Sequence, residues 1–258
     1  MPVVLEAKEV GVQIGATTIV EHANLELAAG QLIAIVGPNG AGKSTFVRAL
    51  SGIQNATGTI AWNGRQLAEV RGRELALMRA FVPQRALVPP GLTVRDAVTI
   101  GRSVHVRPWQ RAGDEDRAAV EAAIERVGVA EFADRQLTTL SGGELQRVQV
   151  AVALAQDAPV LVADEPTSAL DLGATVAIAR LLRGLADDGL AVLLVVHDLT
   201  LAAAIADRVV VMSDGTTVAS GTPREVLTRE RISAVWGVEA SLEVSEDERT
   251  ALHVSWLD

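Results

Sequence analysis

The stretch Gly37-Pro38-Asn39-Gly40-Ala41-Gly42-Lys43-Ser44-Thr45 fits the phosphate-binding pattern G-x-x-x-x-G-K-S in full. Its glycines allow consecutive backbone N–H groups to curl around a phosphate, and a helix that starts at the loop adds partial positive charge. We expect Lys43 to bridge the β- and γ-phosphates of a nucleotide, Ser44 to ligate Mg²⁺ and Thr45 to lie near the α-phosphate. The apolar run 32–36 before the loop predicts a buried strand, and this context disfavours an ordinary glycine-rich turn.

Two carboxylates, Asp164 and Glu165, follow a second apolar run at 160–163. In parallel sheets ligands bind at the carboxyl edge, where such residues lie. Asp164 can hold Mg²⁺ through water, and Glu165 can accept a proton from an attacking water. Alone, the pair could equally be solvated carboxylates at a strand end; together with the phosphate loop, the catalytic interpretation is favoured.

The segment Ser141-Gly142-Gly143-Glu144 precedes a helical pattern in which Leu145, Val148 and Val152 are expected to face the core. Ser-x-x-Glu is a capping box, which is a purely structural explanation. However, each glycine in the first turn costs up to about 1 kcal/mol of helix propensity relative to alanine. Bare amides there can closely approach an anion, so we expect Ser141 to cap the helix and its first turn to receive a phosphate.

Two further polar residues lie at the ends of predicted core segments. His197 follows the apolar run 190–196, where its imidazole could reach a γ-phosphate oxygen, although a lone His is more often structural. Gln84 follows Val82-Pro83, and by itself it is interpreted as a polar loop residue.

The pattern of apolar residues predicts an α/β fold. We expect the following elements: strands at 3–12, 24–27, 32–36, 160–163 and 190–196; a helix at 43–50; hairpins around Asn63-Gly64 and Asp214-Gly215; a helix capped by Asp114 and stopped by Gly128; a helix opened by Asp171; and a helix starting with the capping box Thr222-Pro223-Arg224-Glu225. The sequence pattern is typical of helices from about 85 to 158, which predicts a helical lobe inserted into the core. Alternation in 241–258 predicts a small β-hairpin.

Composition excludes several classes of function. The chain of 258 residues has no cysteine, so disulfides and thiol catalysis are absent, and its formal charge of −9 argues against broad nucleic-acid binding. Residues 1–10 lack the apolar core of a signal peptide. The longest apolar run, 190–196, is far shorter than the roughly 20 residues that span a bilayer. We therefore expect a soluble protein in a reducing cytosol.

Taken together, these residues resemble the ATP-binding subunit of an ABC transporter, over approximately residues 3–238. The resemblance rests on six motifs in order: the phosphate loop 37–45, Gln84, the signature 140–144, the pair Asp164-Glu165, the loop Ser168-Ala169-Leu170-Asp171, and His197. It implies a P-loop ATPase fold with a mainly parallel core sheet, an antiparallel β subdomain and the inserted helical subdomain at about 85–158. The ATP-binding domain would then cover 1–240.

The resemblance also implies partners and residue roles. Two copies would form a head-to-tail homodimer that holds two ATP molecules with Mg²⁺. Ser141, Gly142 and Gly143 of one copy would bind the triphosphate held by the other, with Asp171 at the dimer seam. Glu165 would be the general base, His197 would clamp the γ-phosphate, and Gln84 would link Mg²⁺ and the attacking water to the helical lobe. The dimer would drive two transmembrane permease subunits, and indirectly a substrate-binding protein, from the cytoplasmic face of the plasma (inner) membrane.

One position departs from the family. An aromatic residue usually stacks on adenine at the place that corresponds to Ile14. The resemblance implies that Ile14 packs on the base, with Ile19 and Val20 as neighbours. Because Ile14 carries no ring, the choice between ATP and GTP stays open.

Several stretches are similar to importers of haem, ferric siderophores and cobalamin: 140–155, 196–203, 207–212 and 221–227. Residues 236–238 and the tail are most similar to hemin import ATPases. Other classes fit less well. A DNA-repair relative would need a long coiled coil between Lys43 and Asp164, a translation-type relative usually has two cassettes, and a kinase or GTPase has no role for 140–144.

Overall fold

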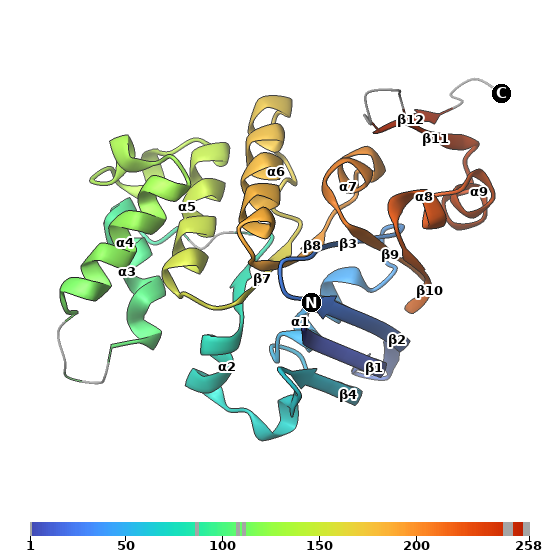
Figure 1. The fold of residues 1–258 in the computed structure, drawn as a ribbon, viewed down its shortest axis with the longest axis horizontal. Helices are drawn as coiled ribbons and strands as arrows, with labels where there is room; N and C mark the ends of the chain where they lie inside the picture. Colours follow the sequence, from blue (N-terminus) through green and yellow to red (C-terminus); the bar gives the residue numbers. More distant parts are fainter. Residues whose placement is uncertain (1, 86–87, 107–108, 110–111, 245–249, 255–258) are drawn as a thin grey trace. The chain divides into compact units, whose positions relative to one another are not determined.

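The computed structural model describes residues 2–85, 88–106, 109, 112–244 and 250–254. The chain divides into two compact units, which are described separately. The first unit comprises Met1–Glu69 and Arg183–Asp258, and the second unit comprises Val70–Leu182. Figure 1 gives the labels of the elements. None of the helices in the described ranges is both long and apolar enough to span a bilayer.

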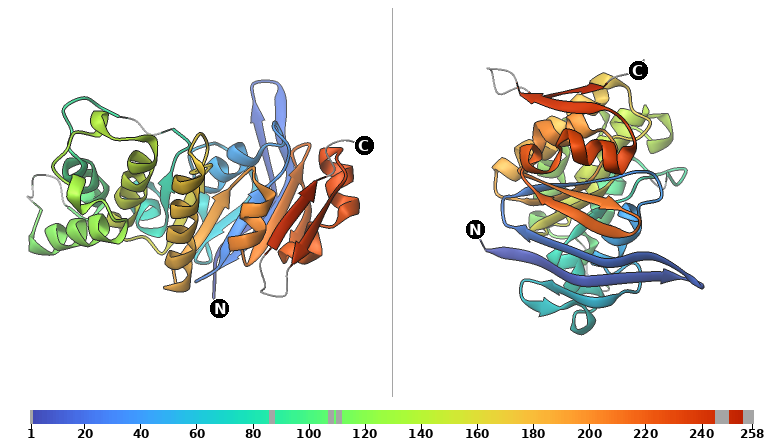
Figure 2. Two further views of the ribbon diagram at one scale, coloured as in Figure 1. Left: turned by 90° about the horizontal axis from the view of Figure 1, so that it is seen from above. Right: turned by 90° about the vertical axis from the view of Figure 1, so that its right-hand side faces the viewer.

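An antiparallel sheet in the first unit starts from a long hairpin, drawn in blue in Figure 2. Its strands occur in the order β2-β1-β4-β5: β1 (Val3–Ile14), β2 (Thr17–Ala28), β4 (Thr57–Trp62) and β5 (Arg65–Gln66). The predicted Asn63-Gly64 turn joins β4 to β5, with φ of +48° and +76° at the two residues. These values fit the two-residue turn that this dipeptide favours.

The other strands of the first unit form a mainly parallel arrangement. They occur in the order β10-β9-β3-β8: β3 (Leu32–Val36), β8 (Ala191–Val195), β9 (Arg208–Ser213) and β10 (Thr216–Gly221). β3 pairs in parallel with β8 and β9, and Asp214-Gly215 turns the antiparallel pair β9–β10. Every residue of β3 and β8 is buried, as expected for parallel strands covered on both faces.

Short helices complete the first unit: α1 (Lys43–Leu50), α7 (Leu199–Ile205), α8 (Pro223–Val226) and α9 (Arg229–Trp236). The predicted box at Thr222 is confirmed, because the Thr222 N–H donates to Glu225 Oε2 at 2.8 Å and Pro223 is the first residue of α8. β11 (Ala240–Val244) pairs antiparallel with β12 (Thr250–Val254). Within the predicted tail hairpin, residues 245–249 and 255–258 lie outside the described part of the chain.

The second unit is largely helical. It contains α2 (Gly72–Met78), α3 (Val94–Gly101), α4 (Asp114–Arg126), α5 (Gly142–Ala155) and most of α6 (Leu172–Asp187), within which the unit boundary falls. α5 packs on α3 and α4. The parallel pair β6 (Ala80–Val82) and β7 (Val160–Asp164) completes it. The α/β class with mainly parallel strands is thus confirmed, whereas the predicted boundaries at 85, 158 and 240 stay predictions.

Three local expectations differ from the structure. The sequence pattern did not predict α2 or β6, and it placed only the last part of β2. The helix cap expected at Asp114 is Gly113 instead, because Asp116 Oδ2 accepts the Gly113 N–H at 2.9 Å. In α5, Leu145 and Val152 are only half-buried, while Gln146, Val148 and Val150 are buried.

Candidate functional site

The phosphate loop connects β3 to α1 in the first unit, and its glycines are required by the backbone around it. Gly37, Gly40 and Gly42 have φ of +155°, +83° and +87°, in the region that favours glycine. A Cβ at Gly37 would lie 2.1 Å from the Met212 carbonyl oxygen, and one at Gly42 would lie 2.8 Å from the Ile19 carbonyl oxygen. The loop is therefore closely packed against β9 and β2 within its own unit.

Lys43 is the first residue of α1, and its side chain is folded back over the loop. Its Nζ donates to the carbonyl oxygens of Gly37 and Pro38 at 2.8 and 2.9 Å, and the residue is only 5% exposed. An ammonium group has three rotatable donors and can exchange carbonyl partners for phosphate oxygens. The loop thus holds the positive charge of Lys43 against its own carbonyl groups, for which a bound phosphate would compete.

His197 lies at the same sheet edge as the phosphate loop. Ile35 of β3 is paired in parallel with Val195 of β8, and each strand leads two residues later to Gly37 and to His197 respectively. His197 is exposed. Asp198 caps α7, since its Oδ1 accepts the N–H groups of Thr200 and Leu201 at 2.8 and 3.1 Å. The register of the strands therefore brings together two predicted site residues that are far apart in the sequence.

The second unit brings Gln84 and Glu165 together in the same way. Val82 of β6 is paired in parallel with Ala163 of β7, and the two side chains follow two residues later. Gln84 Nε2 donates to Glu165 Oε2 at 2.5 Å. Asp164 is fully buried, and Glu165 is 8% exposed with a left-handed φ of +51°. A non-glycine residue in this region is strained, a condition that clusters at functional sites.

The start of α5 is a complete capping box with an exposed first turn. Ser141 donates its N–H to Glu144 Oε2 at 2.7 Å and accepts the Glu144 N–H on its hydroxyl at 3.4 Å. The Ser141 backbone N–H, followed by its hydroxyl, lowers the pKa of Glu144 below the usual value. Ser141 and Gly142 are exposed. The start of α5 is thus accessible from solvent, as the predicted binding of an anion requires.

The two glycines of this turn have different surroundings. A Cβ at Gly142 would meet Leu170 Cδ2 at an ordinary 3.6 Å, whereas one at Gly143 would lie 2.8 Å from Ala174 Cβ. Close packing on α6 is therefore a second reason for glycine at 143, which the sequence did not reveal.

This difference leads to a stability prediction. Gly142→Ala is expected to raise the free energy of unfolding by up to about 1 kcal/mol, because alanine favours the helix. Gly143→Ala is expected to lower it by about 1–3 kcal/mol, because the added methyl group overpacks the contact with Ala174. Urea unfolding followed by circular dichroism would measure both. Equal shifts in the two variants would contradict the packing argument.

The residues predicted to hold Mg²⁺ offer oxygen donors, namely the Ser44 hydroxyl, the Asp164 carboxylate and the Gln84 amide oxygen. Ser44 is half-buried in the first turn of α1. Mg²⁺ prefers oxygen ligands and is commonly bound by one or two carboxylates with substrate phosphates. In the described part of the chain no cluster of three His, Cys, Asp or Glu side chains could hold a metal ion. The three oxygen donors by their chemistry suit Mg²⁺ that is bound together with nucleotide phosphates.

Ile14 ends β1, opposite Thr17, and is 52% exposed. Between the pairs Val12–Val20 and Gln13–Thr18, β2 has one extra residue, Ile19. The carbonyl of this bulge is the one that faces Gly42. Ile14 is therefore two positions from the bulge in the hairpin register, about 7 Å at 3.3 Å per residue, which is within reach of a nucleoside.

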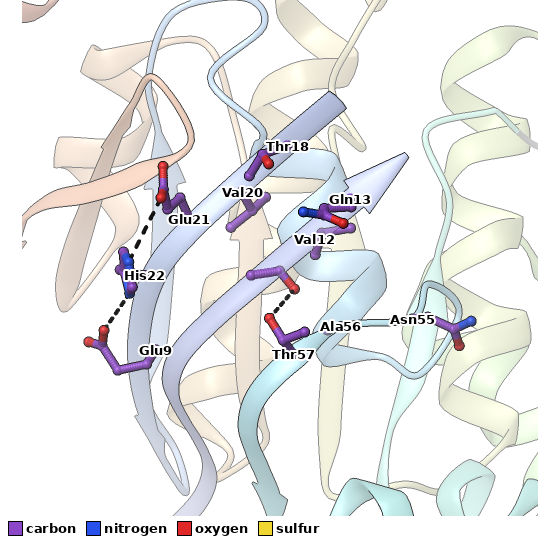
Figure 3. A pocket seen from close by; sticks show the side chains of 11 residues that line it. Glu9, Val12, Gln13, Thr18, Val20, Glu21, His22, Asn55, Ala56 and Thr57 are labelled. Atoms are coloured by element: carbon purple, nitrogen blue, oxygen red, sulfur yellow. Dashed lines mark hydrogen bonds and ion pairs between the residues drawn. The ribbon is translucent and has the colours of Figure 1, made fainter. Parts of the chain in front are cut away.

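A groove of about 430 Å³ on the same sheet was not predicted from the sequence (Figure 3). Its lining includes Glu9, Glu21 and His22 but not Ile14. Glu9 accepts from Asn24 Nδ2 at 3.1 Å and lies 2.7 Å from His22 Nδ1; these two bonds lower the pKa of Glu9, Asn24 having the larger effect. An acidic lining repels phosphate, so this groove is no phosphate subsite.

Comparisons with known proteins agree on one family. The family described as "ABC transporter" matches residues 20–168. The chain is 43% identical to the hemin import ATP-binding protein HmuV of Rhodococcus jostii (91% of this chain, 80% of the relative). It is 37% identical to the iron(3+)-hydroxamate import ATP-binding protein FhuC of Bacillus subtilis (95% and 91%). It is 41% identical to the cobalamin import ATP-binding protein BtuD of Halobacterium salinarum (95% and 61%).

Solved structures show the same similarity. An ABC transporter in an inward-facing conformation superposes with a TM-score of 0.85 at 27% identity, over 99% of this chain and 98% of that one. A dimeric bacterial ABC transporter cassette superposes with a TM-score of 0.75 at 28% identity, over 85% and 99%.

Proposed function

Because the chain belongs to the ABC transporter family, as the ATP-binding subunit of an importer that hydrolyses ATP, we propose that its cargo is haem. The observation that supports haem is the 43% identity to hemin import proteins from Rhodococcus, Nocardia and Streptomyces. A ferric siderophore is the second candidate, supported by the 37% identity to FhuC over 95% of this chain. Cobalamin is the third, supported by the 41% identity to BtuD.

Growth on defined iron sources tests the cargo. A strain that lacks this gene is expected to lose growth on hemin as the sole iron source and to keep growth on a ferric hydroxamate. Restoring the gene should restore growth, whereas a Lys43→Ala copy should not. Loss of growth on the hydroxamate alone would assign the siderophore, and a defect restricted to cobalamin uptake would assign cobalamin.

The proposed reaction is in-line attack of water on the γ-phosphate of ATP, which gives ADP and phosphate. The amides of loop 37–45 and Lys43 bind the β- and γ-phosphates, and His197 donates to a γ-phosphate oxygen. Glu165 accepts the proton of the attacking water, and Gln84 holds the Glu165 carboxylate in place. Mg²⁺, held by Ser44, Asp164 and Gln84, would neutralise charge on the phosphates.

The proposed working form is a head-to-tail pair of chains. Ser141 and Gly143 of one copy bind the triphosphate that Lys43 of the other copy holds, and Asp171 lies at the seam. Two observations support a second copy here: the exposed amides at the start of α5, and the apolar side chain of Leu172, 81% exposed next to Asp171. An apolar side chain at that exposure gains free energy when a partner covers it.

The remaining partners follow from the proposed transport role. Two permease subunits hold the pair of chains at the cytoplasmic face of the plasma membrane, and a substrate-binding protein delivers the cargo to the permease. The formal charge of −9 supports a protein partner rather than nucleic acid.

The aliphatic residue at position 14 gives a prediction about base selectivity. Ile14→Tyr is expected to strengthen ATP binding relative to GTP about five-fold, because base stacking adds about 1 kcal/mol. Titration with both nucleotides would measure the ratio. Ile53→Tyr is the matched control, since Ile53 is 54% exposed. An unchanged ratio in Ile14→Tyr would mean that the base is bound elsewhere.

A further inference from the structure

Gln146 is a buried amide in the middle of α5 that the proposed reaction does not use. It is 8% exposed, and its Nε2 has no hydrogen-bond partner among the residues that the structure describes. The other buried residues of α5 are Val or Ala. A buried donor without a partner has lost its hydrogen bonds to water and has gained no other hydrogen bond. This costs free energy of folding, so the presence of the amide requires an explanation.

The position of Gln146 on α5 shows what it faces. At 100° per residue, it lies about 40° from Gly142 and about 60° from Gly143 around the helix axis, one turn further on. The Cβ positions of these glycines are directed at Leu170 and Ala174. Helical side chains lean toward the N-terminus, so the expected direction of the Gln146 amide is over the glycine turn and toward the segment 165–171.

The segment 165–171 is backbone under strain. Glu165 and Ala169 have left-handed φ of +51° and +61°, which non-glycine residues rarely adopt. The turn is closed by a bond of 3.1 Å from the Ser168 N–H to the Glu165 carbonyl and by a long one of 3.4 Å from the Leu170 N–H to the Thr167 carbonyl. Strained residues with weak local bonds favour a segment with a second conformation.

We propose that Gln146 is a positioning residue for Glu165. When ATP binds, the segment 165–171 changes its backbone conformation and presents a carbonyl oxygen to Gln146 Nε2, which fixes Glu165 for proton acceptance. The inference rests on the proposed roles of Glu165 and of the α5 N-terminus. Since the phosphate-binding turn and the donor lie on one rigid helix, phosphate binding and the placement of Glu165 are coupled directly.

Gln146→Met tests the proposal, because methionine keeps the length of the side chain and removes the donor. We expect kcat for ATP to fall at least about ten-fold, with Kd for ATP and KM within about two-fold, and with an unchanged or higher melting temperature. Gln149→Met, on the same helix, is the matched control and should keep turnover within about two-fold. Normal kcat in Gln146→Met would overturn the proposal, and so would a lower melting temperature, since the amide would then be satisfied at rest.

Gln146→Glu supplies a second readout, the pH dependence of turnover, which would be unaffected if Gln146 only filled space in the core. Its carboxyl group is a donor only when protonated, and burial raises the pKa of a carboxyl group. Its turnover relative to the unmodified protein should therefore rise as the pH falls; a constant ratio would contradict the donor role. Glu165→Gln distinguishes failure of this inference from failure of the proposed function. If the proposed function is wrong, Glu165→Gln keeps its turnover; if only this inference is wrong, Glu165→Gln is inactive.

Discussion

Glu165→Gln is expected to lower ATP turnover about 10²- to 10⁴-fold, the usual contribution of a positioned general base. An amide has almost the shape of a carboxylate but cannot accept the proton of the attacking water. Its carbonyl oxygen can still accept the bond from Gln84 Nε2, so the local structure around the strained residue should persist. The loss should therefore appear in kcat and leave the affinity for ATP almost unchanged.

The same variant should accumulate a stable complex of two copies in the presence of ATP. Phosphate release by the purified protein and size-exclusion chromatography with ATP would measure the two effects. Glu131→Gln is the control, because Glu131 is an exposed carboxylate that is not among the residues proposed to bind ATP. Turnover in Glu165→Gln close to that of the control would remove Glu165 from the role of base.

Lys43→Ala is expected to weaken ATP binding at least about 100-fold, which corresponds to about 2.7 kcal/mol. The variant removes the one charged donor that lies within the loop, and charge-assisted bonds to phosphate are roughly twice as strong as neutral ones. The carbonyl groups of Gly37 and Pro38 would also lose the donor that they now share. Binding should fail before any chemistry can begin.

Titration calorimetry with ATP would measure this loss, with thermal unfolding as a check that the variant is folded. The chain has one other lysine, Lys8, which is exposed and pairs with Glu6 on β1. Lys8→Ala is therefore the matched control and should bind ATP as before. An affinity of a folded Lys43→Ala variant within about three-fold of the control would exclude loop 37–45 as the triphosphate site.

Local sequence was sufficient for the features that depend on residues a few positions apart. The phosphate loop with its helix at 43–50, the turns Asn63-Gly64 and Asp214-Gly215, and the boxes at Ser141 and Thr222 all occur as predicted. In the two boxes, a side chain hydrogen-bonds to backbone N–H groups within one turn. In the loop and the turns, glycine adopts the positive φ that the backbone needs there. Where two neighbours competed for the same role, the prediction was wrong. Gly113 rather than Asp114 is the helix cap because Asp116 binds the Gly113 amide.

Two elements without a clear local pattern were not fully predicted from the sequence. β6 has only three residues and exists because it pairs with β7, about eighty positions later. The first part of β2 is interrupted by the bulge at Ile19, which breaks the alternation that identifies a strand. Neither pairing leaves a local pattern that the sequence alone could reveal.

The sequence by itself determined the chemical groups of this protein: a glycine-rich loop with Lys43 that is predicted to bind phosphate, a strand-end pair of carboxylates, and a second helix start that is predicted to bind an anion. Those features follow from backbone preferences and hydrogen bonds between near neighbours. Only the tertiary structure decided that Gln84 bonds Glu165, that Gly143 is required by Ala174, and that Gln146 Nε2 is buried with no hydrogen-bond partner in the described part of the chain. Such contacts arise when strand register and helix packing bring distant residues together. They depend on the close packing of the complete fold, and no local sequence pattern specifies them.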